Sequence, residues 1–366
     1  MQTYTDVNTG TFTFRALTNH AAESATEPVL WPSIGEYPIY DPALYHALES
    51  DHARNDRFRN ALRELAKDKV VLDIGTGEHL LWAREGIDAG AHHAVAIEVI
   101  EDSHTRASEN VIRHGLDGKI TLLHGLSTRL DVTAKADVCV AEVIGSVAGA
   151  EGAAAVFTDA RRRLLKPNAR CIPHRCVTQA AAVSLREVMG GDEPAFGPGA
   201  VPLLQRIMAW NQGLFDVRLR IRNPVREAIV SGSAAVEILD FNGDLRLEQE
   251  RRVTLVMERP GRIDGILAWL QLACLPDETP LDALRDRTSW ASVYFPLFHQ
   301  DVPVSAGDRL HVTFRTVLSD DGIHPDYRLG AVLHTERGEL SAHLESPHHG
   351  TLLHGHPLYE RLLRPI

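Results

Sequence analysis

One short stretch of the chain, Lys69–Glu98 (KVVLDIGTGEHLLWAREGIDAGAHHAVAIE), combines an acid, a glycine turn and a second acid. A short apolar run ends at Asp73, and Gly75 and Gly77 follow it in a D-x-G-x-G pattern. Glycine has no Cβ, so the backbone can turn tightly there and approach a bound ligand. Glu98 follows about twenty residues later, the spacing at which an acid accepts hydrogen bonds from a ribose diol. The stretch therefore predicts a site for the nucleoside part of a ligand.

A second pair of acids closes a small loop, Glu142 to Glu151 (EVIGSVAGAE). Glu142 directly follows the apolar run Ala136–Ala141, and ligands of open parallel sheets bind where the strands end. Two carboxylates on one loop can grip a guanidinium, because its N–H donors form a planar fork. The spacing alone leaves open the alternative that these are two solvated loop acids without a function, since acids are common in loops.

The form of the glycine turn bears on which nucleoside would bind. A dinucleotide loop would carry G-x-G-x-x-G, but its last glycine is replaced by Leu80, and no Gly-Lys-Ser/Thr for a triphosphate is present. S-adenosylmethionine carries no phosphate, so a site for it must hold only the amino-acid end and the ribose. The pattern favours S-adenosylmethionine as cofactor, and a glycine turn without this role in some other α/β sheet stays the alternative.

The elements that must position these residues follow from the apolar periodicity. Within Lys69–Glu98 it predicts a strand, a helix and a second strand, one unit of a parallel sheet. A helix is expected from Ala43 to about Leu65, a second near Asp102–His114, and strands at Lys119–His124 and Ala136–Ala141. Residues 41–172 are thus predicted to form a Rossmann-like α/β domain that binds the cofactor.

Beyond Pro173 the pattern changes to recurrent strand-like runs separated by turns. This predicts an antiparallel β-barrel or sandwich over residues 173–366, with an insertion at 189–213. Residues 1–40 are polar with weak periodicity and are expected to form a loose N-terminal arm. The histidines that crowd the C-terminal segment are interpreted as part of a solvated tail packed on the barrel, with no metal site, because tight ligand spacing is missing; they are His324, His334, His343, His348, His349, His354 and His356.

Composition narrows the class of protein. The chain has 366 residues, long enough for two domains, and no apolar run of membrane-spanning length. Its net charge of −11 argues against a nucleic-acid surface and suits a cationic substrate. The four cysteines show no metal or redox spacing, and the start of the chain has no secretion-signal pattern, so a cytoplasmic protein is expected.

The ordered set of these motifs resembles the protein arginine methyltransferases. YHALESDHARN (residues 45–55) is similar to the family's N-terminal helix motif, VLDIGTG to its cofactor loop and AIE to its ribose-binding strand end. The acids Glu142 and Glu151 have the spacing of its double-glutamate loop. PHR (173–175) resembles the start of its barrel, and RTSWASVYFPL (287–297) its Thr-His-Trp loop. The GAEGA form around Glu151 and PHR are closest to the monomethylating branch.

The resemblance implies a role for each matching residue. Glu142 and Glu151 would clamp the substrate guanidinium and carry catalysis. Substrate-binding residues would be Tyr45, Leu48 and Trp290. S-adenosyl-L-methionine would contact Arg54, Asp73, Gly75, Gly77, Glu98 and the backbone near Leu126 and Ser127. The family works as head-to-tail dimers, so a homodimer joined through residues 189–213 is expected.

Two departures and one open question accompany the resemblance. His79 replaces the family's third glycine, and Ser289 replaces its loop histidine, which removes a possible partner of Asp51. The substrate is expected to be free L-arginine, converted to the N-omega-monomethyl product for a natural-product pathway such as that of streptozotocin. Arginine in a protein is the competing substrate, and a non-catalytic scaffold that binds the cofactor is the alternative from another class.

Overall fold

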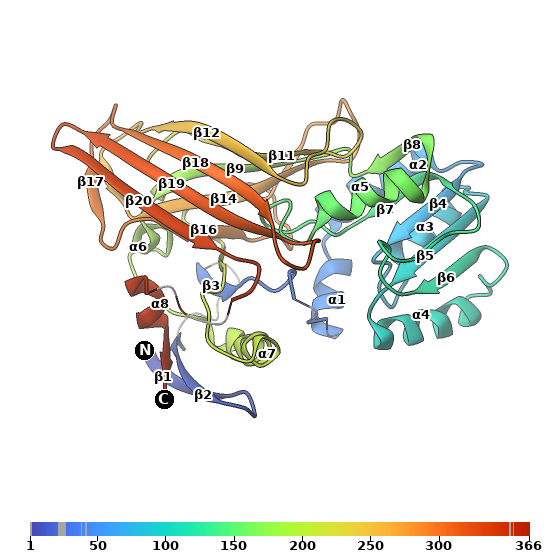
Figure 1. Ribbon diagram of the computed structural model, residues 1–366, viewed down its shortest axis with the longest axis horizontal. Helices are drawn as coiled ribbons and strands as arrows, with labels where there is room; N and C mark the ends of the chain where they lie inside the picture. The colour runs from blue at the N-terminus through green and yellow to red at the C-terminus, as the bar shows by residue number, and fades with distance from the viewer. Residues whose placement is uncertain (1, 21–26, 38, 41, 351–352, 354) are drawn as a thin grey trace.

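The computed structural model describes residues 2–20, 27–37, 39–40, 42–350, 353 and 355–366. An α/β part lies at one end of an elongated molecule and a β-rich part at the other (Figure 1). Both chain termini lie close together below the β-rich part, within a small separate group of strands and helices (Figure 1). Within the described residues, no helix is long and apolar enough to cross a membrane.

The α/β part is built on a five-stranded parallel sheet in the order β6-β5-β4-β7-β8. Its strands are β4 Val70–Ile74, β5 His93–Glu98, β6 Ile120–His124, β7 Ala136–Ala141 and β8 Leu165–Ile172. The strand order reverses beside β4, so the carboxyl ends of β4, β5 and β7 meet at one switch point, where ligands of such sheets bind. The predicted Rossmann-like sheet is confirmed.

Helices cover both faces of this sheet, and apolar side chains seal each face. The helices are α2 His52–Leu65, α3 Leu81–Asp88, α4 Glu101–Arg113 and α5 Ala153–Arg163. Phe58 of α2 stacks on Trp82 of α3 with ring centroids 4.8 Å apart, and both are buried with Phe157 of α5 in one core. Ala107 and Val111 of α4 pack with Ala83 of α3 and Ala94 of β5 in a second cluster. The sheet is therefore a rigid base for the loops at its carboxyl edge.

The single helix predicted from Ala43 to Leu65 is wrong: the structure has α1 (Pro42–Glu49) and then α2 (His52–Leu65). Asp51 interrupts the helix as an N-cap, because its Oδ1 accepts the backbone N–H of Arg54 at 3.0 Å. The break turns α1 away from α2 and toward the gap between the two parts (Figure 1).

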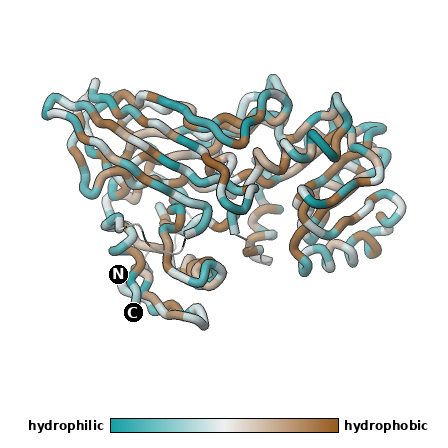
Figure 2. The backbone as a smooth tube through the Cα atoms, viewed as in Figure 1, coloured by the Kyte–Doolittle hydropathy of each residue, from teal (hydrophilic) through white to brown (hydrophobic). Residues whose placement is uncertain are grey.

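The β-rich part consists of two antiparallel sheets that enclose a common apolar core. The seven-stranded sheet follows the order β11-β9-β14-β16-β10-β3, with β15 attached to β14, and the four-stranded sheet the order β12-β18-β19-β20. Apolar and polar residues alternate along β18 to β20, as the colours of Figure 2 show. Their strands are β9 Arg175–Val183, β10 Leu219–Arg222, β11 Ala234–Asp240, β12 Gln249–Val256, β14 Gly265–Ala273, β15 Leu281–Asp282, β16 Ser292–Pro296, β18 Arg309–Leu318, β19 Pro325–Thr335 and β20 Gly338–Ser346. A further pair, β13 Gly261–Ile263 and β17 Val302–Val304, stands apart.

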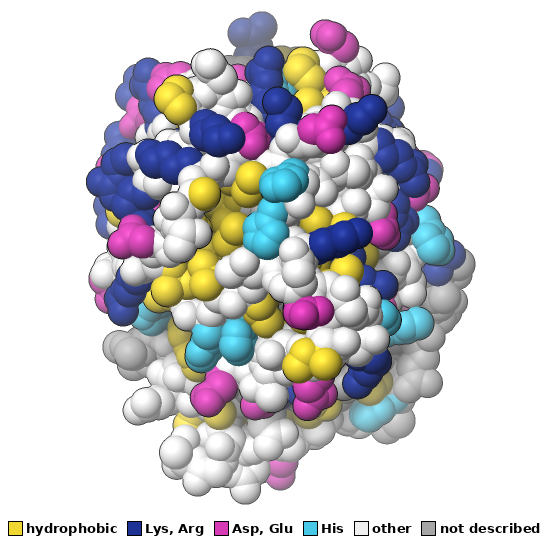
Figure 3. Space-filling model, turned by 90° about the vertical axis from the view of Figure 1, so that its right-hand side faces the viewer, with side chains coloured by type: hydrophobic (Ala, Val, Ile, Leu, Met, Phe, Trp, Pro, Cys, Tyr) yellow, Lys and Arg dark blue, Asp and Glu magenta, His cyan; other side chains and the backbone are white. Residues whose placement is uncertain are grey.

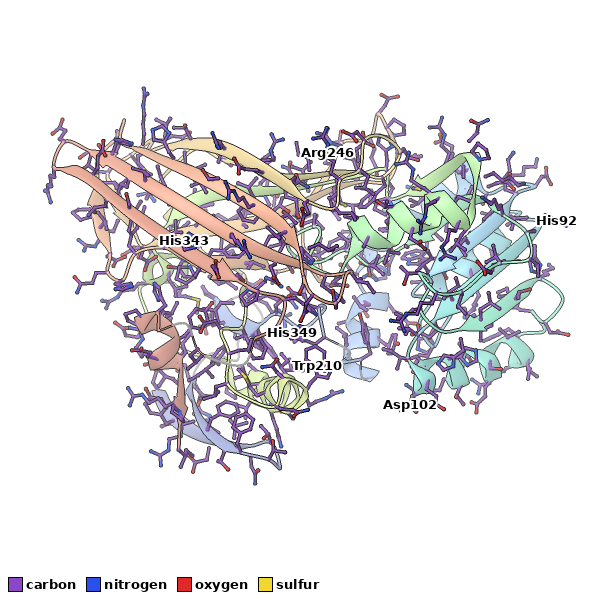
Figure 4. The ribbon with its side chains drawn as sticks, in the orientation of Figure 1. His92, Asp102, Trp210, Arg246, His343 and His349 are labelled. Atoms are coloured by element: carbon purple, nitrogen blue, oxygen red, sulfur yellow. The ribbon has the colours of Figure 1, made fainter. Side chains whose placement is uncertain are left out.

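The C-terminal segment is not the solvated tail that its histidines suggested, because β19 and β20 complete the four-stranded sheet. Tyr327, Leu329, Ala331 and Leu333 of β19 all point into the core. His343, in contrast, lies on the outer side of β20, where Figure 4 labels it. His354 lies outside the described residues.

The N-terminal residues are also more regular than the loose arm expected. β1 Gln2–Asn8 and β2 Thr13–Asn19 form a hairpin that β21 Leu363–Pro365 extends, and α7 Val201–Asn211 and α8 Pro357–Leu362 pack beside it. β3 Val29–Pro32 pairs with β10 of the large sheet. Pairing β3 with β10 leads the next residues, 33–37 and 39–40, toward the α/β part.

Candidate active site

A cavity of about 230 Å³ lies at the carboxyl ends of β4, β5 and β7, where the two parts of the molecule meet residues 33–36 and Tyr40. Most of the predicted site residues line it: Tyr45, Leu48, Arg54, Gly75, Gly77, Glu98, Glu142, Glu151 and Trp290. A larger hollow of about 680 Å³ lies beside β8 and α5, and no predicted site residue lines it. Positive and negative side chains intermingle on the outer face of the α/β part (Figure 3). The chemistry suggested by the sequence is thus gathered in the interior cavity.

The glycine turn forms one wall of this cavity. Gly75 and Gly77 have φ of 76° and 67°, a region that residues with a Cβ rarely adopt. A Cβ on Gly77 would lie 3.0 Å from the ring of Tyr45, so the backbone and the aromatic ring are in close contact. Oε2 of Glu98 accepts the N–H of Gly77 at 2.9 Å, and its Oε1 accepts the N–H of Ile100 at 2.8 Å. The acid predicted for a ribose is therefore held by backbone donors at the rim of the turn.

Asp73, which the resemblance places against the cofactor, lies behind the turn. Its Oδ2 accepts the hydroxyl of Thr76 at 2.6 Å and the N–H of Ala83 at 2.9 Å, and burial raises the pKa of this carboxyl to about 7. It fixes the turn to the start of α3. Leu126 and Ser127 do not line the cavity either; the carbonyl of Ser127 accepts Nη2 of Arg163 at 2.7 Å. Their contact with an adenine stays a prediction.

Glu142 and Glu151 face the same space from the two ends of their loop. Arg54, 2% exposed, donates from Nη1 to Oε2 of Glu142 at 2.7 Å and from Nη2 to the carbonyl of Leu48 at 2.6 Å. Burial raises the pKa of both glutamates, and the charge of Glu142 raises that of Glu151 further. Burial, followed by the charges of Glu151 and Glu142, also raises the pKa of the Tyr40 phenol. The two acids and this ring therefore share one poorly hydrated compartment.

The loop between the glutamates is held by the β-rich part. Nε1 of Trp290 donates to the carbonyl of Ile144 at 2.7 Å. The N–H of Ala148 donates to the hydroxyl of Thr178 at 3.0 Å, and the N–H of Gly149 to Oε2 of Glu237 at 3.1 Å. The loop is thus fixed at its middle, although both its ends belong to the α/β part.

Asp51 and Ser289 are in contact despite the missing histidine. The backbone N–H of Ser289 donates to Oδ2 of Asp51 at 2.6 Å, so the loop before β16 is joined to the cap of α2. His79, the other departure, lies on the cavity wall, with its Nε2 3.1 Å from a carboxylate oxygen of Glu78. The side chain of His79 therefore lies beside the glycine turn.

Sequence reasoning missed one whole wall of the cavity. It consists of Ser33, Ile34, Gly35, Glu36 and Tyr40, which follow β3, together with Arg220 of β10. Gly35 lies directly against Glu151, because a Cβ there would come 1.8 Å from its Oε1. The one feature of the sequence that could have pointed to this wall is the run of prolines and aromatic residues in WPSIGEYPIYDPALY (31–45).

A second group of titratable side chains lies beside this wall. Potential metal-ligand atoms of Asp321, His324 and His348 lie within 4.8 Å of one another, the one such group found among the described residues. The rings of His324 and His348 are parallel, with centroids 4.0 Å apart, so their lone pairs do not converge on one point. Trp210 meets the neighbouring His349 edge-on at 5.6 Å, and Figure 4 labels both residues.

Comparison with known proteins gives several relatives of this chain. No family model matches the chain. It is 27% identical over 277 residues to the arginine N(omega)-methyltransferase of Streptomyces achromogenes subsp. streptozoticus, covering 74% of each chain. It is 29% identical over 244 residues to protein arginine N-methyltransferase 7 of Drosophila yakuba, covering 60% of this chain and 34% of that one. The chain therefore spans about a third of the length of the Drosophila relative.

Two solved structures with a similar fold belong to the same group. The Trypanosoma brucei PRMT1 enzyme-prozyme heterotetrameric complex with AdoHcy matches with a TM-score of 0.68 at 18% identity, covering 84% of this chain and 98% of that one. Arabidopsis thaliana protein arginine methyltransferase 10 matches with a TM-score of 0.65 at 18% identity, covering 84% and 97%. In sequence and in fold, the chain is similar to the protein arginine methyltransferases.

Proposed function

We propose that this protein is an S-adenosylmethionine-dependent N-methyltransferase that acts on the guanidino group of arginine. The observation that carries the proposal is the convergence of Glu142 and Glu151 in one cavity with the glycine turn. A nucleoside-binding turn alone would suit many reactions, and a carboxylate pair alone would suit many cations. Their combination suits transfer from a nucleoside cofactor to a cationic acceptor.

The residues present fit the cofactor. Gly75 and Gly77 leave room for close approach of a ligand, and Glu98 stands where a ribose diol would bind. Arg54 contributes a buried cation near the turn, suited to the methionyl carboxylate, while it also holds Glu142. When bound, S-adenosylmethionine supplies an activated methyl group on a sulfonium. A bound ligand would have to share or replace the present pairing of Arg54 with Glu142.

The carboxylate pair accounts for the chemistry. An arginine guanidinium stays protonated in proteins, with a pKa above about 12, so its nitrogens are weak nucleophiles while the charge is delocalised. Glu142 and Glu151 would draw the positive charge toward the nitrogens that they bind and direct a terminal nitrogen at the methyl group. The methyl group supplied by S-adenosylmethionine would pass to that nitrogen with loss of the thioether, and the nitrogen would then release a proton to Glu151 or to solvent. Positioning and preorganised charge supply most of the rate.

The proposed substrate is free L-arginine, with N-omega-monomethyl-L-arginine as product. Residues 33–36 lie over the cavity beside Glu151, which narrows the room for a polypeptide on that side. The Streptomyces relative, named as an arginine N(omega)-methyltransferase, matches across 74% of each chain. A role in natural-product biosynthesis would follow. Arginine in a protein is the second candidate, because other relatives are named protein arginine N-methyltransferases.

Assembly and location are part of the same proposal. Trp210 of α7 leaves 44% of its surface exposed within the inserted segment 189–213, which suits a homodimer contact. All four cysteines are buried and free, which fits a reducing cytoplasm.

The test compares substrates directly. Purified protein is incubated with S-adenosylmethionine and either free L-arginine or a Gly/Arg-rich peptide, and methylarginine is detected by mass spectrometry. We expect monomethylarginine from the free amino acid only. Glu142→Gln and Glu151→Gln should abolish turnover but retain cofactor binding, whereas Glu109→Gln, an exposed acid on α4, should be fully active. Full activity of both cavity variants would disprove the assignment.

A further inference from the structure

Arg220 brings a second buried guanidinium into the cavity from the β-rich part. It belongs to β10, where its neighbours Leu219 and Ile221 point into an apolar core. Because side chains alternate along a strand, Arg218 and Arg220 point to the other side, and Arg220 lines the cavity. No motif of the sequence draws attention to Arg220.

Arg54 and Arg218, two other buried arginines near the cavity, have anionic partners, whereas Arg220 has none among the residues that the structure describes. Arg54 is paired with Glu142 at 2.7 Å. Arg218 is paired with Glu36 and also donates to the carbonyls of Pro325 at 3.1 Å and Ser346 at 3.0 Å.

Within the described part of the chain, Arg220 makes one hydrogen bond, from Nη2 to the carbonyl of Ser289 at 3.1 Å. Its Nε is buried without a partner, and no carboxylate of the described residues lies within 4.0 Å of it. A guanidinium has five N–H donors. The donors of Arg220 are therefore largely unused.

The surroundings of Arg220 favour an incoming anion. Burial lowers the pKa of Arg220 to about 10, so the side chain is still a cation at neutral pH. Glu151 and Glu36 attract this charge from a distance and Arg222 repels it. Glu36 is committed to Arg218 and to the hydroxyl of Ser33 at 2.9 Å, so it is not free to turn toward Arg220. A buried cation without a counterion is costly, and a bound carboxylate would remove that cost.

We infer that Arg220 binds the α-carboxylate of the amino-acid substrate whose guanidinium lies between Glu142 and Glu151. The inference rests on the proposed function and makes its substrate a free amino acid. A guanidinium and a carboxylate match as two parallel hydrogen bonds, which would fix one end of the substrate while the acids hold the other. An arginine inside a polypeptide has no such carboxylate to offer.

The experiment compares L-arginine with agmatine, which has the same guanidine but no carboxylate. We expect the native protein to favour L-arginine by about 100-fold in kcat/KM, since a charge-assisted pair in a buried site has about this effect. In Arg220→Gln this ratio should fall toward one, mainly through a higher KM for L-arginine, and Arg220→Lys should recover part of it. Arg315→Gln, which changes an exposed arginine on β18, serves as the control. Melting temperature and S-adenosylmethionine affinity are measured for each variant.

The outcomes separate the two proposals. If the native protein methylates neither guanidine, free L-arginine fails as the proposed substrate, and the assignment of Arg220 fails with it. If the native protein methylates L-arginine and agmatine equally well, only the assignment of Arg220 is overturned. The same holds if Arg220→Gln weakens turnover of both substrates alike or lowers the affinity for S-adenosylmethionine, because Arg220 would then position Glu151 or hold the cofactor.

Discussion

Gly35→Ala should disable the protein by displacing a single carboxylate. A Cβ at this position would lie 1.8 Å from Oε1 and 2.7 Å from Cδ of Glu151, where ordinary contact begins at 3.4 Å. The carboxylate must therefore retreat by about 1.6 Å, the difference between those two distances. A misplacement of about 1 Å at a reacting centre can lower a rate about 100-fold, so kcat/KM for arginine should fall at least that much. The fold should tolerate the change, because the atoms displaced are the far end of a flexible side chain.

The assay is methyl transfer to L-arginine, with the melting temperature and cofactor affinity measured on the same samples. Gly118→Ala is the matched control, since a Cβ there would meet nothing within 4 Å. We expect Gly35→Ala to retain a native melting temperature and native cofactor affinity. Native turnover by this variant would refute the argument that the position of Glu151 controls the reaction. A loss that came with unfolding would refute the argument that only its side chain moves.

Three further predictions concern charge and the support of the loop. Burial raises the pKa of Glu142 and Glu151, so both become protonated at a pH above the ordinary range for carboxyl groups. The value of kcat/KM for arginine should therefore fall as the pH is lowered toward that range. A kcat/KM that stays constant down to a pH of about 4.5 would contradict this. Arg218→Met leaves Glu36 buried without its partner and should lower the free energy of unfolding by about 3–5 kcal/mol in urea titrations; a change under about 0.5 kcal/mol refutes it. Trp290→Phe removes the bond to the carbonyl of Ile144 and should cost about 1–3 kcal/mol and reduce kcat; unchanged values for both would show that the loop is held elsewhere.

The parts of the fold that sequence predicted best are those with a strong local pattern. The parallel strands β4, β5 and β7, which position Asp73, Glu98 and Glu142, are largely buried and have the sequence of short apolar runs bounded by turns. The break at Asp51 was missed because the apolar pattern continues on both sides of it, and only the bond from the N–H of Arg54 shows the cap. Buried and more exposed residues do alternate along β19, but the histidines around this strand led to the interpretation of a solvated tail.

The residues of the candidate site also fall into those that the sequence could predict and those that it could not. The residues on the parallel sheet and its loops form linear motifs, so their types and spacing identify them. Gly35, Glu36 and Arg220 reach the cavity only because β3 pairs with β10, a contact between residues almost two hundred positions apart in which Trp31 lies opposite Arg220. No local pattern encodes that pairing. The wall that they form could be found only from the structure.

The most direct test of the central claim is a crystal structure with S-adenosylhomocysteine and L-arginine. The guanidinium should lie within hydrogen-bonding distance of both Glu142 and Glu151, with one terminal nitrogen directed at the sulfur of the cofactor product. An arginine bound elsewhere, or held by only one of these glutamates with its nitrogens turned from the sulfur, would contradict the account.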